Sequence, residues 1–251
     1  MEIKNKNILV TGANRGIGKC LVEEFLSRGV SKVYAAARNI DTLKFDDKRV
    51  TKVDLDVTNF KGIEKTAKNI PTLDILINNA GVLHNVPILG NIEKLDLARE
   101  EIEVNYLGTL NVCNIFWPIV AKNKSDSNKG SIVNIMSALS KVTYPFCGTY
   151  CASKHATLAL TRGLRAQLKE LHVNILEVYP GLTDTDMTEG LDHLPKISPE
   201  QVAKLTIDGI EQDKSEVYTG DDAIEMAAQI AKDPAEAQNE GNQYMPEPLK
   251  I

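Results

Sequence analysis

Hydrophobic residues gather in short runs along the chain, separated by longer stretches in which apolar and polar positions alternate with a helical period. The short runs consist largely of Val, Ile, Leu and Ala, as is typical of strands buried on both faces of a parallel sheet. The runs predict seven strands, at Asn7–Thr11, Lys32–Ala37, Val50–Asp54, Asp74–Asn78, Ser131–Ser137, Asn174–Tyr179 and Glu216–Thr219.

The longer stretches predict helices, because their apolar residues recur every three or four positions. They are Gly16–Arg28, Phe60–Asn69, Leu95–Val120, Thr149–Glu170 and Pro199–Asp213. Strands that alternate with helices are typical of βαβ units with right-handed crossovers. We therefore predict an α/β fold, a single doubly wound, mostly parallel, Rossmann-like sheet of seven strands flanked by helices. Residues 1–232 would form this domain, and 233–251 a polar, proline-containing tail with a remnant of helix and an irregular end.

The first predicted strand runs directly into a glycine-rich turn, TGANRGIG at 11–18, which opens the first helix. Glycine permits a tight turn and a close approach of the backbone to a pyrophosphate. The start of a helix adds free N–H groups and a positive dipole end. The spacing is GxxxGxG instead of GxGxxG, but its place between a strand and a helix distinguishes it from ordinary loop glycines. We predict a dinucleotide-binding turn.

The end of the second predicted strand carries the position that separates the two nicotinamide dinucleotides. An acidic residue there would bind the ribose 2′-hydroxyl, whereas an arginine accommodates a 2′-phosphate. Ala36 and Ala37 stand where the acid would be, Arg38 follows at once, and Arg15 lies in the glycine-rich turn. Two guanidiniums suit a phosphate dianion. We therefore predict NADP as the cofactor.

Tyr150 and Lys154 are spaced so that one face of a helix would present both side chains. A nearby cation favours the phenolate, so we expect Lys154 to lower the pKa of Tyr150 towards a range useful for acid–base catalysis. A YxxxK pair alone is common on helix surfaces. Ser137, however, follows the fifth strand and would place a hydroxyl at the same edge of the sheet. Together they predict a site that exchanges a proton with a substrate oxygen.

An ordered set of motifs resembles the short-chain dehydrogenase/reductase family in its compact form. The motifs are TGANRGIG at 11–18, Asp-Val-Thr at 56–58, Asn-Asn-Ala-Gly at 78–81, Asn105, Ser137, YCASK at 150–154 and Pro-Gly at 180–181. The resemblance spans residues 6 to about 220. It implies an NADP-dependent oxidoreductase that acts on CH–OH groups, such as a carbonyl reductase.

The resemblance also implies a role for each matching residue. Tyr150 would exchange a proton with the substrate oxygen that Ser137 holds, and Lys154 would bind the nicotinamide ribose. Asn105, the fourth catalytic residue, would anchor a water that relays protons from Lys154. The cofactor would be bound by Gly12, Asn14, Arg15, Gly16, Ile17, Gly18, Arg38, Asp56, Val57, Asn79, Ala80, Gly81, Tyr150, Lys154, Pro180, Gly181, Thr183 and Thr185. The sequence departs from the family after Thr219, so substrate and assembly features of that region are not transferred.

The segment after Gly181, TDTDMTEGLDHLPKI, is where members of the family cover the substrate. Its shortness predicts an open or lightly covered pocket, and Lys141 and Lys196 are the only basic residues nearby. We therefore expect an apolar or aromatic aldehyde or ketone in place of a multiply anionic substrate. The candidates to face it are Leu139, Val142, Tyr144, Phe146, Met187, Leu191, His193, Leu194 and His84.

Composition narrows the classes of partner. The formal net charge is −5 and no basic block stands out, so a nucleic-acid partner is not expected. No apolar run approaches the roughly 18 residues of a membrane span, and the amino-terminal residues do not resemble a signal peptide. The four cysteines and four histidines are scattered, which indicates free thiols in a reducing cytoplasm and no metal site.

Two other functions use related features. Nucleotide-sugar epimerases share the Tyr/Lys pair but carry an added carboxyl-terminal domain, for which this chain leaves only about thirty residues. A non-catalytic, NADP-sensing regulator would need the dinucleotide turn but not Asn105, Ser137, Tyr150 and Lys154 together. Oxidation of NADPH in the presence of carbonyl compounds would distinguish a carbonyl reductase from these two alternatives.

Two long helical segments are apolar around more than one face. They are Leu95–Val120, where apolar residues dominate from Ile102 onward, and Thr149–Glu170. A helix with one buried face needs about three or four apolar residues in two turns. The excess predicts that these helices pair with a second copy in a homodimer.

Overall fold

All seven strands expected from the apolar runs are present, and they form one sheet in which every neighbouring pair is parallel. The computed structural model describes residues 1–89 and 92–246. The strand order is β3-β2-β1-β4-β5-β6-β7, so the chain starts in the middle of the sheet and winds towards both edges. The predicted doubly wound α/β fold is confirmed. The strands are β1 (Asn7–Thr11), β2 (Lys32–Ala37), β3 (Val50–Asp54), β4 (Ile75–Asn78), β5 (Gly130–Ile135), β6 (Val173–Pro180) and β7 (Glu216–Thr219).

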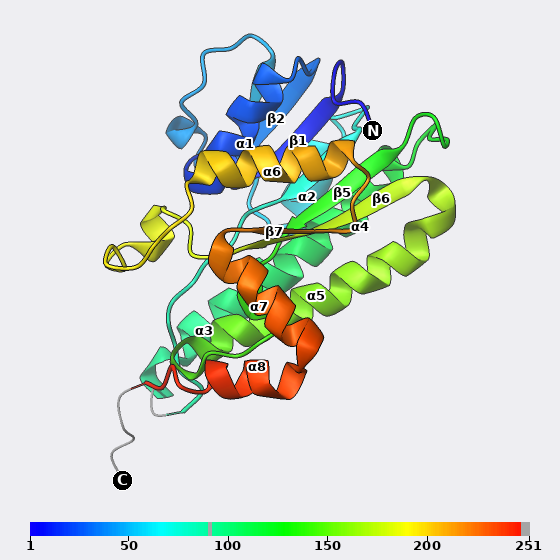
Figure 1. Cartoon of the computed structure of the whole chain (residues 1–251). Helices are drawn as coiled ribbons and strands as arrows, with labels where there is room; N and C mark the ends of the chain where they lie inside the picture. The colour runs from blue at the N-terminus through cyan, green and yellow to red at the C-terminus, as the bar shows by residue number, and fades with distance from the viewer. Residues whose placement is uncertain (90–91, 247–251) are drawn as a thin grey trace.

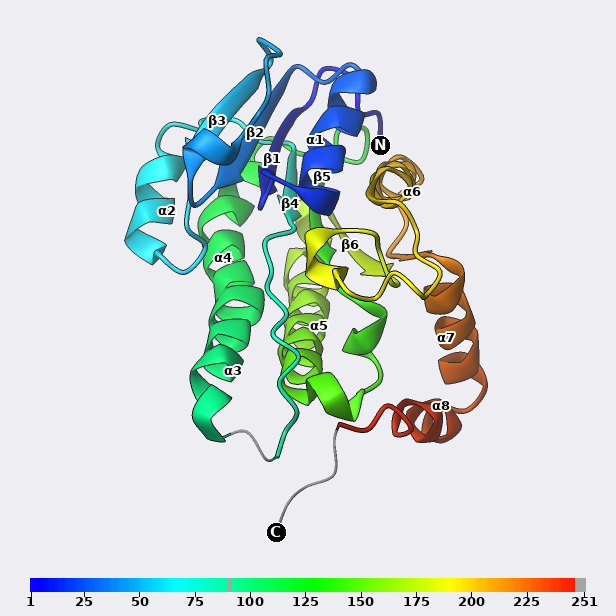
Figure 2. The same ribbon diagram turned by 90° about the vertical axis from the view of Figure 1, so that its left-hand side faces the viewer.

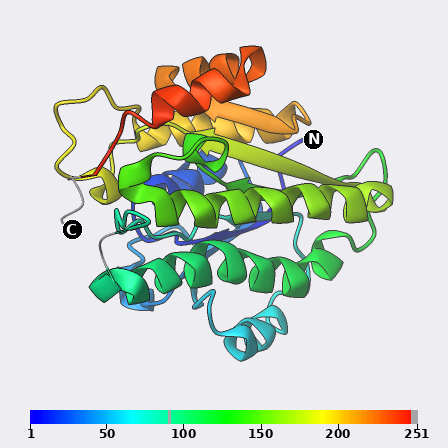
Figure 3. The same ribbon diagram turned by 90° about the horizontal axis from the view of Figure 1, so that it is seen from below.

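Helices cover both faces of the sheet, as Figures 1, 2 and 3 show from three directions. On one face, α1 and α6 pack against the sheet in one hydrophobic core, and α2, α4 and α5 pack on the other face in a second core. Figure 3 shows α4 and α5 lying side by side. The helices are α1 (Gly16–Ser27), α2 (Phe60–Ala67), α3 (Leu95–Glu101), α4 (Thr109–Val120), α5 (Gly148–Leu168), α6 (Pro199–Glu211), α7 (Asp221–Lys232) and α8 (Pro234–Gly241).

The fifth strand is shorter than predicted, and this places Ser137 outside it. β5 ends at Ile135, although the N–H of Met136 still donates to the carbonyl of Val178. Ser137 then starts a 3₁₀ turn, Ala138–Ser140, and its hydroxyl accepts the N–H of Leu139 at 3.1 Å. The serine therefore leaves the sheet because its side chain caps the following turn.

The predicted helix Leu95–Val120 is interrupted. α3 and α4 are joined by a π-helical segment, Ile102–Gly108. There the backbone carbonyl oxygen of Asn105 accepts hydrogen bonds from two hydroxyls, that of Thr109 at 2.8 Å and that of Thr157 in α5 at 3.0 Å. These hydroxyls stabilise a carbonyl in the part of the helix where the regular bonding pattern is broken. Segments of this kind often lie at functional sites.

The chain after β7 forms two further helices. α7 runs back along the edge of the molecule, and α8 turns beneath it towards the loop that precedes α5 (Figure 2). Asp233 caps α8, its side chain accepting the N–H groups of Ala235 and Glu236 at 3.0 and 3.1 Å. Of the predicted tail, 247–251 lie outside the described residues. The rest of the tail is a capped helix followed by a short irregular segment.

Candidate active site

A cavity of about 900 Å³ opens at the carboxyl ends of the strands, where ligands bind in sheets of this kind. Residues from β2, β5 and β6 and from the turns after β1, β3 and β4 reach it. Every residue predicted to bind the cofactor lines this cavity, as do Ser137 and Tyr150. The residues singled out by sequence in separate motifs are therefore neighbours in space.

The glycine-rich turn is wound tightly against the end of β1. Gly12 and Gly16 have positive φ angles of 64° and 50°, which favour glycine. At Gly18 a Cβ atom would lie 2.1 Å from the carbonyl oxygen of Gly12, so a side chain cannot fit. The amide of Asn79 donates to the carbonyls of Thr11 and Gly12 at 3.0 and 3.1 Å. Asn79 thus holds the turn in shape at the edge of the cavity.

This end of the cavity presents the start of a helix and the guanidiniums of Arg15 and Arg38. Arg15 is the N-cap residue of α1, and its side chain makes no capping hydrogen bond with the first N–H groups of that helix. Such groups bind phosphate oxygens. The exposed guanidinium of Arg38 lines the cavity and has no ion-pair partner among residues 1–89 and 92–246. Asp56 turns its carboxylate to the N–H and hydroxyl of Thr58, at 2.9 and 2.8 Å, which orders the loop that carries Val57.

Arg15 makes a contact that the sequence did not indicate. Its guanidinium forms an ion pair with Asp186 at 2.9 Å, and both side chains are about two-thirds exposed. Asp186 belongs to the segment after β6, so the pair bridges the glycine-rich turn and the substrate end of the cavity. An exposed pair of this kind is worth only about 0–1 kcal/mol. Arg15 can therefore exchange this partner for a phosphate at little cost.

The proposed acid–base residues meet at the middle of the cavity. Tyr150 and Lys154 lie in the first two turns of α5, and both are only 6% exposed. The ammonium of Lys154 donates to the carbonyl of Ile135, at the end of β5, at 3.1 Å. It also lies 5.7 Å from the centre of the Tyr150 ring. Ser137 lines the same part of the cavity, close enough to Tyr150 to influence its pKa.

The predicted lowering of the Tyr150 pKa is wrong for the protein on its own. Burial raises the pKa of Tyr150, and the nearby hydroxyl of Ser137 opposes this only in part. Burial also lowers the pKa of Lys154 to about 8, because the charged ammonium loses its solvation by water. The sequence showed the spacing of the pair but not the depth at which both groups are buried. Tyr150 therefore stays protonated at neutral pH.

Asn105 does not line the cavity, since its side chain is used to hold the neighbouring elements together. Its amide group makes a reciprocal pair with the backbone of Val82, accepting the N–H and donating to the carbonyl at 2.9 Å each. It also donates to the hydroxyl of Ser153 in α5 at 2.9 Å. Asn105 thereby joins the loop after β4 to the helix that carries Tyr150 and Lys154.

The substrate end of the cavity contains most of the residues predicted for it. Leu139, Tyr144, Phe146, Met187, Leu191, His193 and Leu194 line it. Val142 and His84 are absent from the lining: Val142 is buried, and His84 lies 3.0 Å from Glu100. Leu83, Leu182, Asp222, Met226 and Tyr244 also line the cavity, although the sequence did not single them out. The last three come from the region after β7, for which neither a motif nor the family pattern gave a signal.

Asp222 is the missed residue with the clearest structural effect. Its carboxylate accepts the N–H of Leu182 at 2.7 Å and fixes the turn after β6. A Cβ atom on Gly181 would lie 1.9 Å from the same carboxylate. A side chain on Gly181 would therefore displace the Asp222 carboxylate from its bond with Leu182, at the position where the cofactor's carboxamide is expected.

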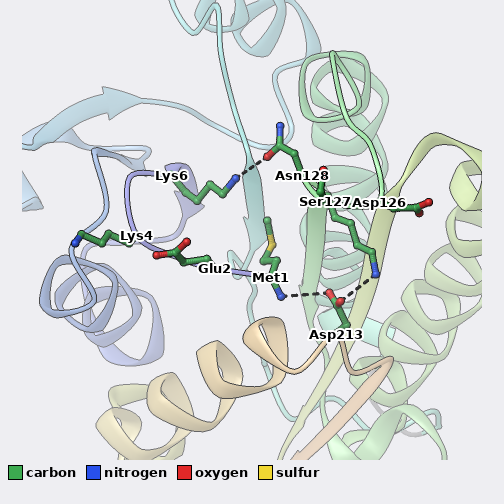
Figure 4. A pocket seen from close by; sticks show the side chains of 9 residues that line it. Met1, Glu2, Lys4, Lys6, Asp126, Ser127, Asn128 and Asp213 are labelled. Carbon is green, nitrogen blue, oxygen red and sulfur yellow. Dashed lines mark hydrogen bonds and ion pairs between the residues drawn. The ribbon is translucent and has the colours of Figure 1, made fainter.

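A second, smaller hollow lies near the amino ends of the strands, with a volume of about 160 Å³ (Figure 4). Several of its charged groups are paired with one another. The amino terminus and Lys129 both pair with Asp213, and Lys6 donates to Asn128. Glu2 and Lys4 also line it, and among the described residues they form no ion pair. Over the described ranges, no three His, Cys, Asp or Glu side chains converge as a metal site would require. Within those ranges, too, every helix is too short or too polar to cross a bilayer.

The chain is similar to known oxidoreductases over most of its length. Residues 6–195 match the profile of the family described as short chain dehydrogenase. The chain is 35% identical over 201 residues to the short-chain dehydrogenase PC-15 of Penicillium crustosum, a match covering 77% of this chain and 71% of that protein. It is 30% identical over 219 residues to the NADP-dependent 3-hydroxy acid dehydrogenase of Schizosaccharomyces pombe, covering 81% of each. A short chain dehydrogenase from Burkholderia cenocepacia J2315, solved in complex with NADP, has a TM-score of 0.89 and 36% identity, covering 96% of this chain and 98% of that one.

Proposed function

The chain belongs to the short-chain dehydrogenase/reductase family of oxidoreductases, and from this we propose that it is an NADP(H)-dependent carbonyl reductase. It would transfer hydride between the nicotinamide and an apolar or aromatic aldehyde or ketone. The observation that carries the proposal is the meeting of Ser137, Tyr150 and Lys154 in one cavity with the glycine-rich turn and Arg38. The named NADP dependence of the yeast relative and the NADP bound to the Burkholderia protein support the choice of cofactor.

The cofactor would lie along the cavity with its phosphates at the start of α1. Arg38 and Arg15 would bind the 2′-phosphate, and the loops with Asp56, Val57 and Gly81 would border the adenosine. Pro180, Gly181, Thr183 and Thr185 would contact the carboxamide, and Lys154 the adjacent ribose. When bound, the nicotinamide supplies the hydride for reduction or accepts it in oxidation.

The protein's own residues would handle the proton. During reduction Ser137 donates a hydrogen bond to the carbonyl oxygen and places it beside Tyr150. Tyr150, protonated because burial raises its pKa, gives its phenolic proton to that oxygen. The positive charge of Lys154 stabilises the phenolate that results. A proton returning by way of Lys154 and a water near Asn105 would restore Tyr150.

The substrate end favours a neutral compound. The cavity's Arg and Lys side chains, as far as the chain is described, are Arg15, Arg38 and Lys154, all on the cofactor side. A carboxylate such as that of a 3-hydroxy acid would therefore meet no fixed positive charge at the substrate end. The four cysteines, which are free in the structure, suit the cytoplasmic location that we propose.

The test is NADPH oxidation with a panel of neutral aldehydes and ketones. Tyr150→Phe keeps the ring and removes only the proton donor, so turnover should fall about 10²–10⁴-fold. Its dissociation constant for NADPH should stay within a factor of about three of the wild-type value. A Tyr150→Phe protein with more than a tenth of normal turnover would exclude Tyr150 as the acid. A wild-type protein that binds NADPH but reduces nothing would favour the sensing regulator.

A further inference from the structure

The chain after Asp233 returns to the active site and packs against the loop between Ser137 and Tyr150. Gln238 of α8 makes a reciprocal pair with the backbone of Thr143, accepting its N–H and donating to its carbonyl at 2.9 Å each. The N–H of Phe146 donates to the carbonyl of Tyr244 at 3.2 Å. These bonds join the carboxyl-terminal segment to the loop by backbone and side chain at two separate places.

The two segments approach closely because the end of α8 lacks a side chain where they meet. A Cβ atom on Gly241 would lie 3.0 Å from the carbonyl oxygen of Thr143 and 3.3 Å from the Tyr144 ring. Gly241 is buried, and so is Ala237 one turn earlier. The small residues Ala237 and Gly241 therefore allow α8 to pack directly against the loop before α5. The chain that follows α8 then reaches the mouth of the cavity.

Tyr244 lies in the segment after α8 and, with Tyr144 and Phe146, forms an aromatic wall of the cavity. Its ring stacks on that of Tyr144, with centroids 4.2 Å apart and planes 10° from parallel. Phe146 lies 6.3 Å from Tyr144 at an inclination of 46°. All three rings line the cavity that holds Ser137 and Tyr150. Tyr244 as a whole residue remains 52% exposed, which is unusual for a large aromatic residue that only fills a core.

We propose that Tyr244, supported by Tyr144, is a specificity-determining residue that selects flat, uncharged carbonyl compounds. The planar group of the substrate packs against the aromatic wall while its carbonyl points towards Ser137 and Tyr150. A flat π-system gains more from stacking on tyrosine than a puckered saturated ring of the same size does. The inference rests on the proposed function, because it assigns the substrate class of that same site.

The deciding experiment measures binding, so it does not depend on turnover. The probes are methyl naphthyl ketone, which is flat, and its saturated counterpart methyl decalyl ketone, titrated by calorimetry into protein saturated with NADP⁺. In the wild type the flat ketone should bind more tightly. Tyr244→Ala should lower that preference about 2- to 10-fold, the range expected for one aromatic pair. Tyr244→Phe, which keeps the ring, should retain it.

Met245→Ala is the matched control, because Met245 neighbours Tyr244, is 68% exposed and does not line the cavity. It should leave the preference unchanged, and all variants should bind NADPH as the wild type does. A Tyr244→Ala protein that keeps the full preference, or weakens for both ketones equally, would overturn the inference. Failure of the wild type to reduce either ketone would count against the proposed function alone, since the binding ratio still decides the role of Tyr244.

Discussion

Arg38 is the residue on which the choice between NADPH and NADH depends. Its guanidinium lines the cavity without an ion-pair partner among the described residues, directly after the buried end of β2. Losing a hydrogen bond to a charged group typically costs about 1.5–3 kcal/mol, or roughly one to two powers of ten in affinity. We expect Arg38→Ala to weaken NADPH binding by this factor and to leave NADH binding nearly unchanged. Equal affinities of the wild type for the two cofactors would contradict the assignment.

Lys154 gives the reaction a pH dependence with a definite sign. Burial lowers its pKa to about 8, so its charge is present below that pH and is lost above it. Tyr150 has a raised pKa and remains protonated throughout this range. We therefore expect kcat/KM for reduction, which reports the free enzyme, to fall as the pH rises through about 8. Lys154→Arg should be much less sensitive up to pH 10, because the guanidinium stays charged. A wild-type profile that is flat to pH 10 would rule out this role for the Lys154 charge.

The residues that the sequence could predict are those whose spacing fixes their place. Tyr150 and Lys154 share a helix face, and the glycine-rich turn follows a strand, so local periodicity brings them to the cavity. Tyr244 and Asp222 reach the same cavity only because α7 and α8 fold back along the edge of the molecule. No local sequence pattern indicates that these two residues approach the cavity. The direction of the Tyr150 pKa was mispredicted for the same reason, because burial is a property of the folded chain.

At the scale of elements, the strands could be predicted from the sequence. The π-helical interruption between α3 and α4 could not. A strand buried on both faces can be recognised in the sequence as a continuous apolar run. A π-helical segment shifts the helical register by a single residue, and the apolar residues from Ile102 onward are dense enough to hide that shift. The hydroxyls of Thr109 and Thr157, which satisfy the Asn105 carbonyl, come from different helices. Their convergence is visible only in the folded chain.

α8 is an element whose start depends on one side chain. Asp233 accepts the N–H groups of both Ala235 and Glu236, which the helix itself cannot satisfy. Replacing such a cap by alanine typically costs about 0.5–2 kcal/mol. We expect Asp233→Ala to speed hydrogen exchange of the α8 amides and to raise KM for aromatic ketones, with NADPH affinity unchanged. Asp233→Asn, which can still cap, is the control. Unchanged exchange in α8 would show that its packing alone holds the helix.

At the scale of the whole molecule, the two faces of the sheet are covered differently. α1 and α6 pack against each other over one face, whereas α4 and α5 lie side by side over the other (Figure 3). Leu110 of α4 is half-buried and belongs to none of the hydrophobic cores of the described chain, whereas Trp117 and Ile119 pack against the core beneath α4; α5 carries exposed Ala152 and Ala159. The described part of the carboxyl-terminal segment packs elsewhere, over the loop before α5. Within the described chain, these residues are therefore open to contact with a second copy.

We accordingly predict a homodimer in which α4 and α5 of two copies pack across a two-fold axis. Light scattering at micromolar concentration should give a mass near twice the 27.6 kDa of one chain. Ala159→Arg places a long charged side chain on the outward face of α5 and should shift the equilibrium towards the monomer. Ala228→Arg, at an exposed position on α7, is the matched control and should leave the dimer intact. Because the small residues of α5 allow two helices to approach closely, the charge would have to be buried or the helices separated, and either outcome is costly. A single-chain mass for the wild type would mean that the half-buried apolar residues of α4 simply remain at the surface.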